Sequence, residues 1–174
     1  SAYSQGSASP SPFVTNHAPT TTSVSDGSSS TATPTNVGVN VTFTSTGTDS
    51  DSNQYYLAIC KSAVINPAVN GPPTCASGLL TWVISGAIVS GNPATPTYTA
   101  LITDVESNPW YAYVCDKVTS QGNGPGLCSA LDQGTTSPSP FIVNHAPTYS
   151  AGPSDSSSST ATPTNVGSNV TFTA

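Results

Sequence analysis

Gln54-Tyr-Tyr-Leu-Ala-Ile-Cys-Lys61 and Trp110-Tyr-Ala-Tyr-Val-Cys-Asp-Lys117 are the densest apolar runs of the chain. Both runs are short, rich in aromatic and β-branched side chains, and preceded by turn-forming Asp, Asn, Ser or Pro, which is the pattern of a buried strand. No stretch of twelve residues keeps a helical period, because Pro and Gly interrupt the chain throughout. We therefore expect an all-β protein with these two segments as its central strands.

Four further segments carry strand patterns, at Val37–Thr44, Leu79–Ser85, Thr97–Thr103 and Phe141–His145. In the first, valines and Phe43 alternate with small or polar residues, which is the period of a half-buried strand. In the third, Tyr98, Ala100 and Ile102 should share one face. Thr20–Thr35, rich in Ser, Thr and Pro, is either a mucin-like spacer or an edge strand whose prolines prevent further pairing. Seven short strands separated by turns predict a β-sandwich or barrel.

The two central strands are followed by similar loops. After Cys60 the loop ends in Asn-Gly-Pro-Pro-Thr-Cys75, and after Cys115 it ends in Asn-Gly-Pro-Gly-Leu-Cys128. This parallel favours the local pairs Cys60–Cys75 and Cys115–Cys128, with a cross-strand Cys60–Cys115 bridge as the competitor. Each local bridge would close a loop of about 15 residues and add up to ~3 kcal/mol on the chain-entropy model. Zinc is the rival use of four cysteines, but short CxxC pairs are missing, so we expect disulfides and an extracellular setting.

One phrase of the sequence occurs twice: Ser9–Thr20 returns as Ser137–Thr148, and Ser30–Gly38 returns as Ser159–Gly167. The period, about 128 residues, is too long for a solenoid unit and suits a whole domain. Residues 1–17 would then be the last strand of a preceding repeat, 18–145 a complete sandwich, and 146–174 the first strands of the next. The expected partners are adjacent copies of the repeat, in the same chain or, by strand exchange, in neighbouring subunits.

The composition excludes several kinds of partner. Only 2 Lys and Arg residues stand against 8 Asp and Glu residues, which gives a net charge of −6. A nucleic-acid-binding protein needs a basic face, and anionic membrane surfaces attract basic segments, so neither partner is expected. Ser and Thr make up about a third of the chain. Hydroxyl groups, rather than charges, must therefore keep its surface hydrated.

Three motifs, DSDSNQYYLAIC at 49–60, ESNPWYAYVC at 106–115 and SPFIVNHAPT at 139–148, resemble repeats of very large bacterial cell-surface proteins. The resemblance implies tandem immunoglobulin-like or fibronectin type III-like antiparallel β-sandwiches that form a stalk, an adhesin or a filament. It implies architecture rather than chemistry, since such sandwiches host many functions. An adhesin tip or a carbohydrate-binding module of a larger secreted protein is the alternative, and exposed aromatic residues on one sheet face would favour it.

Oxygen-bearing side chains precede both central strands, at Asp49, Asp51 and Asn53 before the first and at Asp104 and Glu106 before the second. Alternate oxygen ligands are typical of calcium loops, and calcium could bridge the two turns if both lay at one end of the sandwich. The alternative is that these side chains only close turns by bonding to the backbone.

Two kinds of glycosylation are candidates. Asn40 and Asn169 begin Asn-Val-Thr sequons at equivalent positions of the two copies. The Ser/Thr-rich segments could carry O-linked sugar, which would supply the solubility that charge does not. The candidate O-linked positions are Thr20, Thr21, Thr22, Ser28, Ser29, Ser30, Thr31, Thr33, Ser157, Ser158, Ser159, Thr160 and Thr162.

Nothing in the sequence points to catalysis. His17 and His145, at equivalent positions, each stand two residues before a Pro, and we expect them to pack at a joint between domains. Without a third His or a reactive Cys there is no acid, base and nucleophile set, so no enzyme is predicted. The aromatic residues at alternating strand positions should mostly build the core rather than a sugar-stacking surface.

Overall fold

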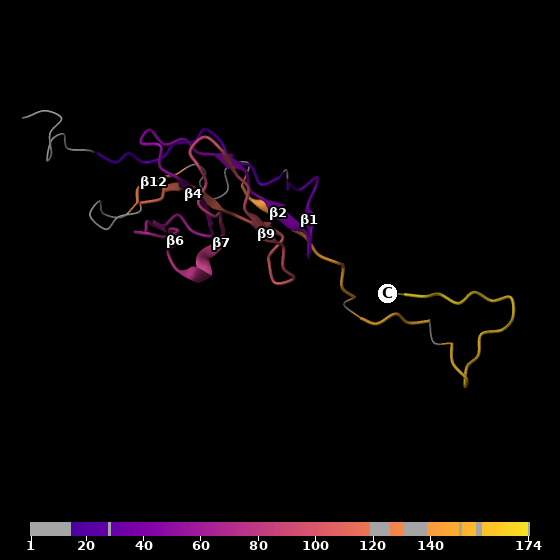
Figure 1. Cartoon of the computed structure of the whole chain (residues 1–174). Coiled ribbons are helices and arrows are strands. Elements are labelled where there is room, and N and C mark those ends of the chain that lie inside the picture. Colours follow the sequence, from indigo (N-terminus) through magenta and orange to yellow (C-terminus); the bar gives the residue numbers. More distant parts are fainter. Residues whose placement is uncertain are drawn as a thin grey trace, which may run out of the picture. The chain divides into compact units, whose positions relative to one another are not determined.

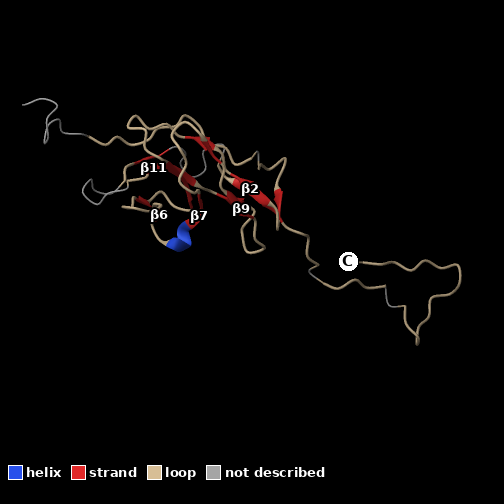
Figure 2. Ribbon diagram, in the orientation of Figure 1, coloured by secondary structure: helices blue, strands red, loops and turns tan. Residues whose placement is uncertain are grey.

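The computed structural model describes residues 15–27, 29–118, 126–130, 139–149, 151–155 and 158–173. The chain divides into two compact units, Ser1–Asn144 and His145–Ala174, which are described separately (Figure 1). The first unit is all-β and consists of several small sheets, mostly antiparallel, an arrangement compatible with a β-sandwich (Figure 2). Its one short 3-10 helix, η1 (Gly78–Leu80), is the only helix in the described part of the chain.

The main sheet of the first unit has the strand order β12-β11-β4-β7. Its strands are β12 (Cys128–Ala130), β11 (Tyr111–Asp116), β4 (Tyr55–Cys60) and β7 (Thr81–Ile84). β4 and β11 pair in antiparallel register along their full lengths, from Tyr55 opposite Asp116 to Cys60 opposite Tyr111. The two segments predicted as central strands thus lie side by side in the middle of this sheet.

Smaller strand groups surround the main sheet. β13 (Phe141–Asn144) pairs in parallel with β1 (Thr35–Asn36) and antiparallel with β10 (Ser107–Asn108). The remaining antiparallel pairs are β2 (Asn40–Thr42) with β9 (Thr97–Thr99), β3 (Ser45–Thr46) with β8 (Pro93–Ala94), and β5 (Ile65–Asn66) with β6 (Thr74–Cys75).

Every residue of β4 is buried, because both faces of this strand are covered. Tyr55, Leu57 and Ile59 belong to the principal core, where Phe43 meets Trp110 edge to face at 5.4 Å between ring centroids. The alternate residues face a second cluster that includes Cys60, Cys75 and Cys115. Such two-sided burial explains why the sequence of β4 is continuously apolar rather than alternating.

Two strand predictions are only partly right. The predicted strand Val37–Thr44 begins at Asn40, because Asn36–Val39 forms a turn in which Gly38 has φ +85° and Val39 N donates to Asn36 O at 3.0 Å. Val37 and Val39 are therefore exposed, whereas Val41 and Phe43 are buried. The predicted strand Thr97–Thr103 ends at Thr99, since a turn follows, and Ile102 is 79% exposed rather than facing the core.

The second unit contains the second copy of a segment that is also present in the first unit. We call residues 20–45 the first copy and residues 148–174 the second copy. In the described part of the second copy the structure has one isolated bridge, between Ser154 and Thr173, and no named strand. Phe172, the counterpart of the fully buried Phe43, is 76% exposed.

Candidate functional site

The four cysteines form two disulfides, Cys60–Cys75 and Cys115–Cys128, with Cα–Cα distances of 5.6 and 4.0 Å. These are the local pairs that the duplicated loops favoured, and no free cysteine is present. Because Cys60 is the last residue of β4 and Cys115 is in β11, the bridges attach their loops beside the two central strands. No thiol is left to act as a nucleophile or as a metal ligand.

The two acidic turns that could share a calcium ion if they lay at one end of the sandwich lie at opposite ends of the sheet, so the condition for a calcium bridge is not met. Tyr55 at the start of β4 pairs with Asp116 at the end of β11, so the residues that precede each strand are separated by the length of the strand pair. For six-residue strands this separation is roughly 17–20 Å, whereas calcium–oxygen distances are about 2.3–2.6 Å. Within the described residues, no group of three or more His, Cys, Asp or Glu side chains could hold a metal ion.

The five residues of the predicted calcium site have local contacts instead. Asp49 Oδ1 accepts hydrogen bonds from the backbone N–H groups of Asp51 and Asn53, at 2.7 and 3.3 Å, and so closes its own turn. Asp104 accepts from the Tyr98 hydroxyl at 2.9 Å and from Leu101 N at 2.8 Å. Backbone closure by Asx side chains was the alternative to calcium, and it describes both turns. Glu106 contributes its backbone carbonyl, which accepts from Val143 N at 2.9 Å.

One polar cluster joins residues that are far apart in the sequence. Asn16 Nδ2 donates to Asp116 Oδ2, and Asn16 Oδ1 accepts from Asn53 Nδ2 at 3.0 Å. Beside this pair, His17 N donates to Asp51 Oδ2 at 2.6 Å, and His17 Nδ1 lies 3.1 Å from both Asp51 carboxylate oxygens. We call this region, where β4 begins and β11 finishes, the Asp116 end of the unit.

The two acids of this cluster lie in different environments. Asp116 is 2% exposed, and its Oδ1 accepts a hydrogen bond from Leu127 N while its Oδ2 accepts from Asn16. The pKa of Asp51 is lowered from its ordinary value of 3.8, chiefly because the His17 backbone N–H donates to the ionised carboxylate. The hydrogen bond from residue 17 therefore favours the ionised form of the Asp51 carboxyl group.

The seven Tyr and Trp residues of the predicted strands, all of them described by the structure, do not form an exposed binding face. Tyr55 and Trp110 are fully buried and Tyr56 and Tyr113 nearly so, while Trp82, Tyr98 and Tyr111 are half-buried. Trp82 packs edge to face on Tyr98 at 4.9 Å, and Lys61 Nζ lies 4.0 Å from the centroid of the Trp82 ring. Burial, followed by the hydrogen bond to Asp104, raises the pKa of the Tyr98 hydroxyl. These residues serve packing, as aromatic pairs in cores do.

The structure separates the candidate glycosylation positions by exposure. The exposed positions are Asn40, Asn169, Thr20, Thr22, Thr31, Thr33, Ser159, Thr160 and Thr162. The half-buried positions are Thr21, Ser30 and Ser158, and the structure does not describe Ser28 and Ser157. Among the candidate positions that the structure describes, Ser29 is the one that folding excludes. It is 7% exposed, its Oγ donates to Ile142 O at 3.0 Å, and the same oxygen accepts from Ile142 N at 3.0 Å. A sugar on Ser29 would break the contact between this segment and β13.

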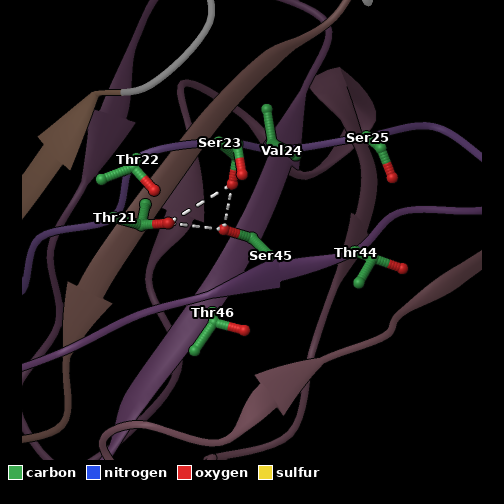
Figure 3. A pocket seen from close by; sticks show the side chains of 8 residues that line it. All are labelled: Thr21, Thr22, Ser23, Val24, Ser25, Thr44, Ser45 and Thr46. Carbon is green, nitrogen blue, oxygen red and sulfur yellow. Dashed lines mark hydrogen bonds between the residues drawn. The ribbon is translucent and has the colours of Figure 1, made fainter.

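A pocket of about 240 Å³ lies between Thr21–Ser25 and Thr44–Thr46 (Figure 3). Two of its hydroxyl groups bond to each other and to the backbone: Thr21 Oγ1 lies 2.9 Å from Ser45 Oγ, which donates to Ser23 O at 2.8 Å. The lining contains no charged side chain. These hydroxyls hold the outer segment to the strand beneath it and have no base to activate them.

Comparisons of the chain with protein-family models, curated proteins and solved structures give no match. Among the described residues, no helix is long and apolar enough to span a membrane. The two disulfides are compatible with an extracellular or secreted protein. The polar cluster at the Asp116 end and the contact of Ser29 with Ile142 were not predicted from the sequence, although the repetition of Asn16-His17 at Asn144-His145 was a signal for the cluster.

Proposed function

We propose that this chain is part of an extracellular bacterial surface filament or stalk, in which immunoglobulin-like sandwich repeats follow one another along a single polypeptide. One observation carries the proposal: the chain joins the first unit at its Asp116 end and leaves it at the opposite end (Figure 1). Asn16 contacts Asp116, whereas Asn144 donates to Asn36 at 2.8 Å, and neighbouring Val143 bonds to Glu106, upstream of β11. A unit with its connections at opposite ends suits head-to-tail assembly, which produces open linear arrays.

Three further features support a structural role. The first unit uses all its cysteines for internal bridges, Asp49 and Asp104 for turns, and the large aromatics of its core for packing. The Ser/Thr-rich segment lies against the unit as an outer layer, with bridges at Thr20–Thr48 and Ser25–Thr44. The resemblance of the three sequence motifs to bacterial surface repeats agrees with this role. O-linked sugar on the exposed hydroxyls, such as Thr22 and Thr31, would hydrate a surface that carries few charges.

Sizing of the native material after prolonged heating with detergent and reductant tests the proposal. Because repeats in one polypeptide cannot separate, we expect chains of very high mass, and electron microscopy should show a fibre about one domain wide. A discrete band of one or two repeats would contradict it and would favour strand exchange between subunits. Native masses of the peptides that hold Thr22 and Thr31 test the sugar. Unmodified masses would remove glycosylation from the proposal without affecting the array.

A further inference from the structure

The segment Asn-His-Ala-Pro occurs at both ends of the first unit, at 16–19 and at 144–147, and the structure shows a different set of contacts for its Asn at each place. At the Asp116 end, Asn16 Nδ2 donates to Asp116, and Asn16 Oδ1 accepts from Asn53 at 3.0 Å. At the other end of the unit, Asn144 Nδ2 donates to Asn36 Oδ1 at 2.8 Å. If both Asn residues end the last strand of a repeat, Asn144 shows the contacts that this Asn makes within its own repeat, and Asn16 shows the contacts that it makes with the next repeat.

A single carboxamide can make all of these contacts at once. An Asn side chain carries two N–H donors and one carbonyl acceptor. One donor would serve the Asn36 position of its own repeat, and the second would serve the Asp116 position of the next. The carbonyl oxygen would accept from the Asn53 position of that next repeat. No group has to be shared, and every hydrogen-bonding group of the amide is used.

We propose that the Asn that ends each repeat bridges it to the next repeat, and that the following His is held by the next repeat's Asp51 position. The partner surface is therefore the Asp116 end of a following copy of this same repeat. This inference rests on the proposed tandem array and adds to it a fixed joint between successive units. Pro19, the last residue of the segment, is fully buried in the first unit, which further anchors the incoming chain.

The end of the first unit around Asn144 has an apolar surface that such a joint would cover. Exposed Val37 and Val39 flank Gly38, whose N–H donates to Ala100 O at 2.8 Å, and so lie beside the exposed pair Leu101 and Ile102. Val37 N donates to Asn144 O at 3.3 Å, which places this apolar patch next to the point where the chain leaves the unit. With only Ala146-Pro147 as a connector, the following copy is the occupant that chain continuity brings to the patch.

The test uses the 174-residue chain lengthened at its C-terminus by residues 46–145, so that the second copy becomes a whole repeat. NMR relaxation of this chain reports whether its two repeats tumble together. We expect one common rotational correlation time, which splits towards separate, shorter values in the double variant Asn144→Ala with His145→Ala. A variant of the second repeat's counterpart of Asp116, changed to Asn, should weaken the same coupling from the other side of the joint.

Asn169→Ala is the matched control, because Asn169 is an exposed Asn of the second copy outside the joint, and it should leave the common tumbling unchanged. Independent tumbling of the two repeats in the unsubstituted lengthened chain would overturn the joint. Common tumbling that survives the double variant Asn144→Ala with His145→Ala would also overturn it. Small-angle scattering distinguishes a failure of the proposed joint from a failure of the proposed tandem array. A long particle with independently tumbling repeats rejects only the joint, whereas a second repeat that stays unfolded rejects the joint and the array together.

Discussion

The first copy, residues 20–45, and the second copy, residues 148–174, have closely similar sequences but different structures. Phe43 is fully buried and Val41 pairs with Tyr98 of β9, while their counterparts Phe172 and Val170 are exposed. Yet three local features recur. Gly38 and Gly167 have φ +85° and +87°. Hydroxyl pairs join Ser30 to Thr33 and Ser159 to Thr162, and bridges join Ser25 to Thr44 and Ser154 to Thr173.

The comparison separates local from tertiary causes of structure. Turns and the one bridge form in both copies because their partners are within about 20 residues in sequence, whereas the strands β1 and β2 form only in the first copy. Those strands need β13 and β9, which lie more than 50 residues further along the chain. Short strands gain most of their stability from packing and pairing rather than from intrinsic propensity. The second copy therefore retains the local turns and lacks the sheet.

The largest expected difference between the copies is at the paired phenylalanines. Phe43→Ala removes a core side chain that touches Trp110 and Phe141, and should lower the free energy of unfolding by about 3–5 kcal/mol. Phe172→Ala in the same 174-residue chain should change it by less than about 0.5 kcal/mol, as exposed substitutions do. Denaturant unfolding of both variants measures the difference. Equal effects would mean that the second copy is packed like the first.

A smaller loss of unfolding free energy should follow from removing the Cys60–Cys75 disulfide, which covers the outer face of β4. Replacing Cys60 and Cys75 together by Ala should cost up to ~3 kcal/mol on the chain-entropy model. Because the first copy folds on the sheet that β4 organises, its amide protection should fall together with that of β4, while the second copy is unaffected. Protection of the first copy that outlasts β4 would contradict this dependence.

The buried serine gives a matched pair with a still smaller effect. Ser29→Ala leaves the N–H and C=O of Ile142 without the partner they share, which should cost about 1–3 kcal/mol. Ser158, its counterpart in the second copy, is only half-buried, and its N–H donates to nearby Asp155 O at 3.3 Å, so Ser158→Ala should be nearly neutral. Thermal unfolding of the two variants side by side measures this; a neutral Ser29→Ala would show that its contacts with β13 do not stabilise the unit.

The smallest effect concerns pH at the Asp116 end. The folded-state pKa of Asp51 lies below its ordinary 3.8, so the bond from His17 stabilises the unit fully above that value. The contribution is lost as pH falls through the lowered folded pKa. NMR titration should therefore show His17 N–H detaching from Asp51 only below about pH 3.8. In Asp51→Asn this acid step should disappear, and detachment that begins well above pH 4 would point to another group.

The all-β class and the two central strands could be predicted from local sequence, whereas the ends of other strands and the positions of distant turns could not. The runs around Leu57 and Val114 became β4 and β11 with errors of one residue, since dense apolar runs have few alternatives. The alternating pattern places Val39 and Ile102 in strands because it continues past the true strand ends into turns, where both side chains are exposed. The acidic turns could share a calcium ion only if both lay at one end of the sandwich, and a sequence pattern does not reveal that the strands following them are antiparallel. The strand ends depend on local turns such as the one at Gly38, whereas the positions of the acidic turns depend on the tertiary pairing of β4 with β11.

In the candidate site, too, features that depend on local sequence could be predicted and features that depend on distant residues could not. The disulfide pairs followed from two similar loops, each visible in its own stretch of sequence. The contacts of Asn16 with Asn53 and Asp116 join residues up to 100 positions apart, and only the fold brings them together. The burial of Ser29 against Ile142 spans 113 positions and was equally invisible in a segment that reads as a spacer.

Hydrogen exchange at two equivalent amides tests the central claim most directly. Phe43 N donates to Pro96 O at 2.9 Å, and we expect this amide to exchange slowly in the 174-residue chain while the Phe172 amide exchanges fast. When the chain is lengthened by residues 46–145, which restore the missing partner strands, the Phe172 amide should become as protected as that of Phe43. A Phe172 amide that is already protected in the 174-residue chain, or one that stays fast in the lengthened chain, would contradict the account.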